Sequence, residues 1–73
     1  MTVDEFKSTL AILVAENRNH EAIDFVVKYL PQVRRLMSTE DRLLVADWME
    51  GVEMALDLGI DGSKVEPRSA SSA

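Results

Sequence analysis

The chain of 73 residues contains no cysteine, two prolines and a single histidine, His20. Without cysteine it can form neither a disulfide nor a thiolate zinc site, and one histidine cannot build a histidine-based metal site. We therefore expect no metal and no other cofactor. A core this small stabilises a domain by only about 3–5 kcal/mol, so self-association or docking on another protein is the expected source of further stability.

Long apolar runs and excess positive charge are also missing. The longest apolar run, residues 10–15, has six residues, whereas about 20 are needed to span a bilayer. Thirteen acidic residues outnumber eight basic ones and give a net charge of −5. Nucleic acid and anionic membranes attract clustered lysine and arginine, so we expect neither as a direct partner. A signal peptide begins with basic residues, whereas this chain begins with the acidic residues Asp4 and Glu5. We therefore predict a cytoplasmic protein.

Apolar residues recur at helical spacing in three segments, and strand-like alternation is absent. Thr2 and Glu5 predict a capping box before a first helix over residues 3–16. A second helix is expected from near His20 to Met37, and a third after Ser38 or Thr39. The predicted core stripes are Val3, Phe6, Leu10 and Leu13; Ile23, Val26, Val27, Leu30, Val33 and Met37; and Val45, Trp48, Val52 and Ala55. The sequence thus predicts a small all-α domain of three helices.

Pro31 interrupts the second stripe. Proline lacks the amide N–H and collides with the carbonyl four residues earlier, here that of Val27. One interpretation is a single helix kinked at Pro31, and the other is a helix that stops near Tyr29, with a short piece following to Met37. Because the stripe keeps its phase through the proline, we favour a kinked or narrowly broken helix.

Glycine has two predicted roles in the third helix. Gly59 is expected to end that helix in a left-handed conformation, with Ile60 folding back as in a Schellman motif. Gly51, in mid-helix, either permits close approach of another backbone or is simply tolerated. Small and polar residues dominate after Asp61, so we predict a helical domain over residues 1–61 and a disordered tail over residues 62–73.

Catalytic and phosphate-binding motifs are absent from the sequence. A nucleophile needs a nearby base, and His20 stands alone in the first turn of a predicted helix, where a surface or capping role is expected. The three glycines are scattered and form no phosphate loop. We therefore expect no catalytic residue and no enzymatic activity.

The third predicted helix carries a row of acidic residues, and no lysine or arginine lies between them in the sequence. The row comprises Asp47, Glu50, Glu53 and Asp57. It is either a solvated face, or a partner for Arg34, Arg35 and Arg42 of a neighbouring helix or subunit, or a docking surface for a basic partner.

Apolar residues exceed what a lone three-helix domain can bury, and such an excess indicates an interaction surface. The predicted interface comprises Leu43, Met49 and Met54 with Ile12 and Val14 on the first helix, and the acidic row supplies charge specificity. The leading hypothesis is therefore a non-enzymatic protein–protein interaction module, expected to be a homo-oligomer and to bind another protein.

Two alternatives stay open at this point. The first is a small acidic inhibitor or nucleic-acid mimic, whose carboxylate row blocks a basic groove on its target. The second is a binder of a small anion such as a nucleotide, held by Lys28, Arg34 and Arg35 at a subunit interface.

Overall fold

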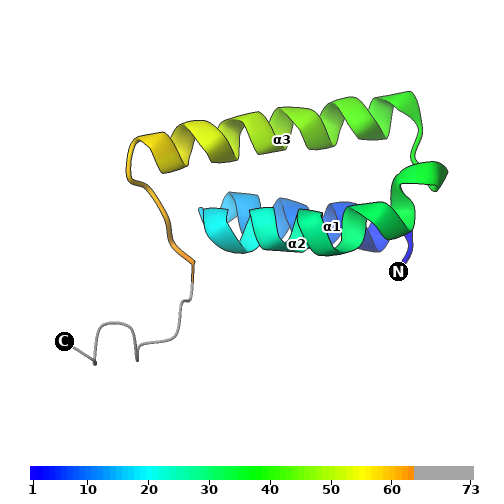
Figure 1. The fold of residues 1–73 in the computed structure, drawn as a ribbon, viewed down its shortest axis with the longest axis horizontal. Coiled ribbons are helices and arrows are strands. Elements are labelled where there is room, and N and C mark those ends of the chain that lie inside the picture. The colour runs from blue at the N-terminus through cyan, green and yellow to red at the C-terminus, as the bar shows by residue number, and fades with distance from the viewer. Residues whose placement is uncertain (64–73) are drawn as a thin grey trace.

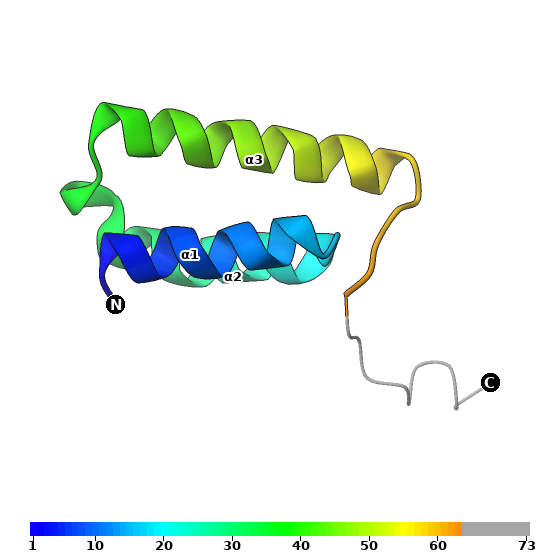
Figure 2. The ribbon, with the colours of Figure 1, turned by 180° about the vertical axis from the view of Figure 1, so that it is seen from behind.

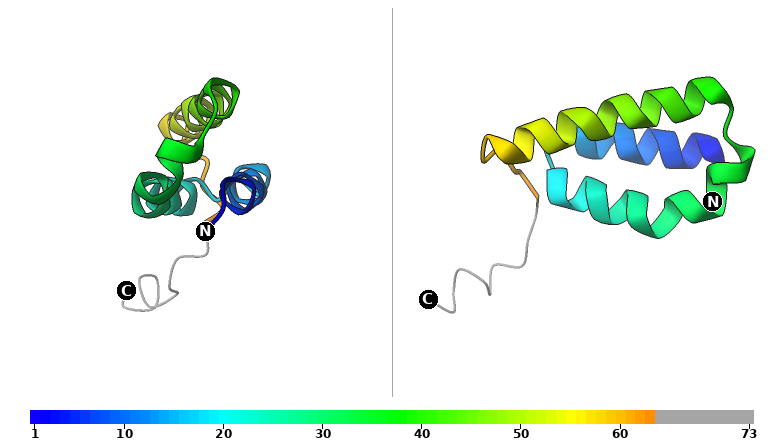
Figure 3. Two further views of the ribbon diagram at one scale, coloured as in Figure 1. Left: turned by 90° about the vertical axis from the view of Figure 1, so that its right-hand side faces the viewer. Right: turned by 45° about the horizontal axis from the view of Figure 1, so that its top comes forward.

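The computed structural model describes residues 1–63 as three α-helices joined by short connections (Figure 1). Helix α1 spans Val3–Ala15, α2 spans Asn19–Val33, a 3-10 turn η1 spans Arg34–Leu36, and α3 spans Thr39–Asp57. Helices α1 and α2 lie side by side and α3 lies over both, as the opposite views of Figures 1 and 2 show. Seen end-on, the helices occupy the corners of a triangle (Figure 3). The predicted all-α, three-helix fold is confirmed.

Capping boxes start α1 and α3. The Thr2 hydroxyl accepts a hydrogen bond from the Glu5 amide at 3.0 Å, and the Thr2 amide donates to the Glu5 carboxylate at 2.8 Å. Ser38, rather than Thr39, caps α3: its hydroxyl accepts from the Asp41 amide at 3.0 Å, and its amide donates to the Asp41 carboxylate at 3.2 Å. Each box satisfies two backbone N–H groups that a helix start leaves without partners.

Left-handed residues end α1 and α3. Gly59 has a φ of 79°, and the Ile60 amide donates to the Ala55 carbonyl at 2.9 Å. This is the 6→1 bond of a Schellman motif, so the prediction for the end of the third helix is confirmed. Asn17 ends α1 in the same way with a φ of 57°, a conformation that asparagine tolerates better than most residues.

Helix α2 runs through Pro31 and ends at Val33, where η1 continues the chain towards α3. The alternative in which this helix stops near Tyr29 is therefore wrong. Pro31 is exposed, and so is Val27, whose carbonyl loses its usual partner four residues on. The Val27 carbonyl therefore needs another partner, such as water, in place of the missing N–H.

The core lies where the three helices meet. Its buried apolar side chains are Phe6, Leu10, Leu13, Ala22, Val33, Met37, Val45 and Val52. The Phe6 ring is fully buried and stacks on Phe25 with 5.3 Å between the ring centroids. Trp48 is half-buried and packs against this core, as its stripe predicted. Val27 departs from the predicted stripe: 70% of it is exposed, because it lies on the outer side of α2.

The ordered contacts continue past the predicted domain boundary at residue 61. Gly62 donates its amide to the Asn17 carbonyl at 2.6 Å, and the Ser63 hydroxyl accepts from the Glu21 amide at 3.1 Å. Both residues belong to the predicted tail over residues 62–73, yet Gly62 contacts the connection between α1 and α2, and Ser63 contacts the first turn of α2. The rest of that predicted tail, residues 64–73, lies outside the described residues.

Candidate functional site

The segment after α3 returns to the start of α2 and caps it. We name residues 60–63 the return segment; it descends from the end of α3 in Figure 1. Asp61 accepts from the Asn19 amide at 3.0 Å and from the His20 amide at 3.3 Å. The His20 ring donates from Nδ1 to the same carboxylate. The return segment therefore supplies the cap that α2 lacks locally, since Arg18 at its N-cap makes no side-chain capping bond.

Electrostatics favour this arrangement. The hydrogen bond from His20 first, and then that from Ser63, hold the pKa of Asp61 well below its usual range. The carboxylate also lies at the positive end of the α2 dipole. Asn19 completes the contact: its side chain is buried and donates from Nδ2 to the Ile60 carbonyl at 2.7 Å. The return segment is thus bound through polar contacts at the start of α2.

Sequence reasoning missed the return segment. The signal available was weak: the start of α2 has no serine, threonine or aspartate at its N-cap, so its first N–H groups need partners from elsewhere. Asp61 and Ser63 can supply such partners, but they lie about 40 positions away along the chain. The predicted capping or surface role of His20 does match its place beside Asp61.

The outward side of α3 carries large apolar side chains that are mostly exposed. Leu43, Met54 and Leu58 are exposed by 66%, 61% and 76%. At about 100° of rotation per residue they lie within roughly 60° of one another around the helix. Asp47 and Glu50 fall between them and are exposed as well. We name these five residues the α3 outer face.

The other members of the predicted interface lie elsewhere. Met49 is half-buried and turns toward α2, and Val14 packs against the core. Ile12 is 55% exposed. It lies about 140° around α1 from Lys7, which marks the side of α1 that faces α3. Only Leu43 and Met54 of the predicted apolar set therefore share a surface.

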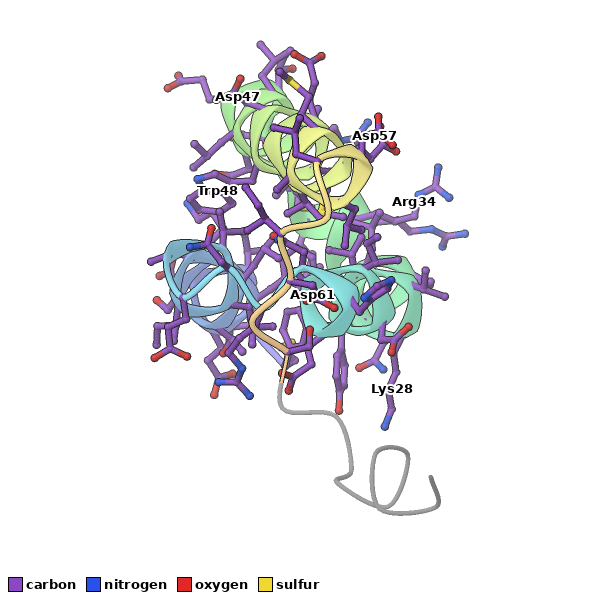
Figure 4. All side chains as sticks on the ribbon, turned by 90° about the vertical axis from the view of Figure 1, so that its left-hand side faces the viewer. Lys28, Arg34, Asp47, Trp48, Asp57 and Asp61 are labelled. Atoms are coloured by element: carbon purple, nitrogen blue, oxygen red, sulfur yellow. The ribbon has the colours of Figure 1, made fainter. Side chains whose placement is uncertain are left out.

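The predicted acidic row is fully on the outside of α3, but it fans across the helix. Figure 4 shows Asp47 and Asp57 pointing to different sides of α3. Within residues 1–63, Lys7 pairs with Asp41 and Arg18 pairs with Glu16 and Glu21, while the His20 ring hydrogen-bonds Asp61. None of these contacts joins the row to Arg34, Arg35 or Arg42, and pairing with a neighbouring subunit stays a prediction.

Lys7 and Asp41 form the ion pair that joins α1 to α3. Lys7 Nζ donates to the Asp41 carboxylate at 2.8 Å. This bond, followed by the capping bond from the Ser38 amide, lowers the pKa of Asp41, and the same carboxylate raises the pKa of Lys7. Asp41 thus serves both the start of α3 and the α1–α3 contact.

The predicted anion-binding residues separate into two groups. Arg34 and Arg35 line one polar depression together with Pro31 and Arg42. Lys28 lies apart on the lower side of α2 in Figure 4, where its ammonium group sits 5.3 Å from the centre of the Tyr29 ring. Arg42, from the first turns of α3, is thus the third cation near Arg34 and Arg35, in the place where Lys28 was expected.

A groove between α2 and α3 opens beside these arginines. Val26 and Leu30 line it from α2, and Val45 and Met49 line it from α3. Arg34 and Arg42 close one end, and the groove encloses about 400 Å³. No residue of α1 contributes to it, and Figure 4 shows Arg34 projecting outward where α2 and α3 meet.

Among residues 1–63, no three acidic or histidine side chains converge as metal ligands would. None of the helices there combines the length and the apolar character required to cross a bilayer.

No protein-family model, curated protein or solved structure matches this chain.

Proposed function

We propose that this protein is a non-enzymatic interaction module whose α3 outer face docks a basic amphipathic helix of another protein. The observation that carries the proposal is the exposure of Leu43, Met54 and Leu58 on one side of one helix. Large apolar side chains gathered on one surface are typical of interaction sites. An amphipathic helix fits this surface, since its own apolar stripe can pack along a helix.

The charge of the α3 outer face selects the chemistry of the partner. Between residues 43 and 58 the helix carries four acidic residues and no basic one. A symmetric pair of α3 helices would bring the acidic residues of one copy close to those of the other, which is unfavourable. A helix rich in lysine or arginine meets the same surface with complementary charge. We therefore propose a different chain as the partner, in place of the self-association expected from composition.

Gly51 supports close packing beside this surface. An added Cβ there would have nothing within 4 Å, so no contact within residues 1–63 requires a glycine. The prediction that Gly51 permits close approach therefore applies, in this proposal, to the backbone of the docked partner. A glycine on a helix surface lets a second helix come nearer than a larger side chain would.

The apolar contacts alone give weak binding. Full burial of Leu43, Met54 and Leu58 contributes about 5–9 kcal/mol at roughly 1.5–3 kcal/mol each. Association itself costs about 4–15 kcal/mol, so the apolar term is largely offset. The charge pairs with Asp47 and Glu50 must then steer the encounter and fix the register. This balance leaves at most about 5 kcal/mol, which predicts a dissociation constant no tighter than a few tenths of a millimolar. The binding should weaken moderately in salt.

The test uses a labelled helical peptide with leucine at helical spacing and lysine elsewhere, measured by fluorescence anisotropy. The double variant Leu43→Glu with Met54→Glu should reduce binding by about tenfold or more. The matched control, Ile12→Glu with Leu36→Glu, changes two exposed apolar residues on other elements and should bind as the parent does. Equal loss in both variants, or no loss in the first, overturns the proposal.

Light scattering after size exclusion accompanies this test at low and high salt. A mass near 8.2 kDa is expected for the protein alone. A stable dimer that the Leu43→Glu with Met54→Glu variant dissolves would mean that a second copy, and not a basic helix, occupies the face.

The two alternatives have less support from the geometry. A nucleic-acid mimic needs carboxylates in a row, and Asp47 and Asp57 point to different sides of α3. Binding by such a mimic would collapse in high salt, whereas apolar docking persists. The nucleotide hypothesis places Lys28, Arg34 and Arg35 at a subunit interface, and within one chain Lys28 lies over Tyr29, apart from the arginines.

A further inference from the structure

We propose that the groove between α2 and α3 binds a medium-chain alkyl carboxylate, with the alkyl chain in the groove and the carboxylate held by Arg34 and Arg42. This site is separate from the α3 outer face and is independent of the proposed function. Its volume of about 400 Å³ falls within the range of small-ligand sites, about 300–1,000 Å³.

The body of the groove is apolar from floor to walls. Val45 and Met37 are buried and form its floor, while Val26, Leu30 and Met49 are partly buried and form its walls. Ala46 lies on the rim, where a small side chain leaves the groove open. Water in such a groove has few polar partners, so an alkyl chain that displaces it gains the free energy of apolar burial.

Positive charge gathers at one end only. Arg34 and Arg42 line both the groove and the polar depression beside it, which also includes Arg35. Nη2 of Arg42 donates to the Arg34 carbonyl at 2.9 Å, which holds the Arg42 side chain at this end. Within residues 1–63 none of the three guanidinium groups has an acidic partner, and no aspartate or glutamate lines either hollow. A carboxylate placed there would satisfy guanidinium N–H groups in the paired geometry that arginine favours.

The length of the groove favours an alkyl chain over a protein helix. Its lining runs only from Val26 to Arg34 on α2 and from Arg42 to Met49 on α3. Each of these segments rises about 10–12 Å along its helix, or roughly two turns. A docked helix would need a longer apolar path, whereas an extended chain with one charged head fits an apolar slot closed by cations.

The test is calorimetric titration of the full-length protein with decanoate, decanol and acetate below micelle-forming concentrations. Decanoate should bind, decanol should bind about tenfold or more weakly because it lacks the charge, and acetate should not bind because it lacks the chain. Equal binding of decanoate and decanol, or no binding of decanoate at millimolar concentration, overturns the proposal.

Variants locate the site. Arg34→Ala with Arg42→Ala should weaken decanoate about tenfold or more while leaving decanol unchanged. Ala46→Leu should block both ligands by filling the groove, and leucine is well tolerated in a helix. Lys28→Ala removes a cation outside the groove and serves as the matched control.

Two results keep the proposal separate from folding defects and from the proposed function. If the double arginine variant loses helicity, two other measurements still test the proposal. One compares decanoate with decanol on the parent protein, and the other measures both ligands on the Ala46→Leu variant. Leu43→Glu with Met54→Glu should leave decanoate binding unchanged. Loss of decanoate binding in that variant would overturn the assignment to the groove.

Discussion

The same substitution at two glycines should change stability in opposite directions. Gly62 lies in the return segment, and a Cβ added there would sit 2.9 Å from the Glu16 carbonyl oxygen and 3.4 Å from that of Asn17. Gly51 lies in mid-helix, with nothing within 4 Å of an added Cβ. Alanine therefore meets backbone atoms at one site and open space at the other.

The magnitudes follow from these surroundings. Gly51→Ala should stabilise the fold by about 0.5–1 kcal/mol, because alanine loses less conformational freedom in a helix. For a domain of this size the melting temperature should rise by roughly 2–8 °C. Gly62→Ala should destabilise it by about 1–3 kcal/mol, as overpacking does. The loss of stability is limited, because the return segment can detach from α2 while the three helices stay packed. The variant then loses only the contacts that the return segment makes.

Thermal unfolding followed by circular dichroism measures both variants under one set of conditions. A rise for Gly51→Ala together with a fall of at least about 4 °C for Gly62→Ala is the expected result. Shifts in the same direction would mean that Gly51 and Gly62 do not differ in the space around an added Cβ. An unchanged melting point for Gly62→Ala would mean that the return segment adds nothing to stability.

Three further predictions concern the core, the end of α3 and pH. Phe6→Ala should cost about 3–5 kcal/mol, comparable with all the stability of so small a domain; urea unfolding of the variant should show no cooperative transition. Gly59→Ala should lower stability by about 1–2 kcal/mol in the same assay, because the φ of 79° is unfavourable for a residue with a Cβ. Asp61 has a lowered pKa, so its stabilising contribution is present above its unfolded pKa of about 3.9 and is lost as the pH falls below it. Melting points between pH 7 and about 2.5 should therefore fall less steeply for Asp61→Asn than for the parent, and parallel curves would contradict the role assigned to the return segment.

Local features were predictable because their causes lie within a few residues. The Thr2–Glu5 capping box and the Gly59 Schellman motif each involve groups within one helical turn or so. The spacing of Phe6, Leu10 and Leu13 was enough to define the buried side of α1.

Features that depend on how each helix is rotated about its own axis in the bundle were harder to predict. The predicted stripe of α2 included Val27, which is exposed in the structure. Helical spacing identifies the apolar side of a helix, but it does not show how much of that side the neighbouring helices bury. The predicted interface combined Ile12, Met49 and Met54, which point in different directions once the three helices pack. Arg42 joins Arg34 and Arg35 only because η1 turns the chain back toward α2.

Composition, periodicity and capping act locally, so they were enough to predict a small helical domain without cysteine, an acidic third helix, and helix boundaries at Thr2 and Gly59. Three features emerged only when the helices packed: Asp61 and Ser63 cap α2, Lys28 lies apart from the arginines, and an apolar groove ends at Arg34 and Arg42. Each of these depends on contacts between residues far apart in the chain, and such contacts are fixed by how helix faces pack against one another.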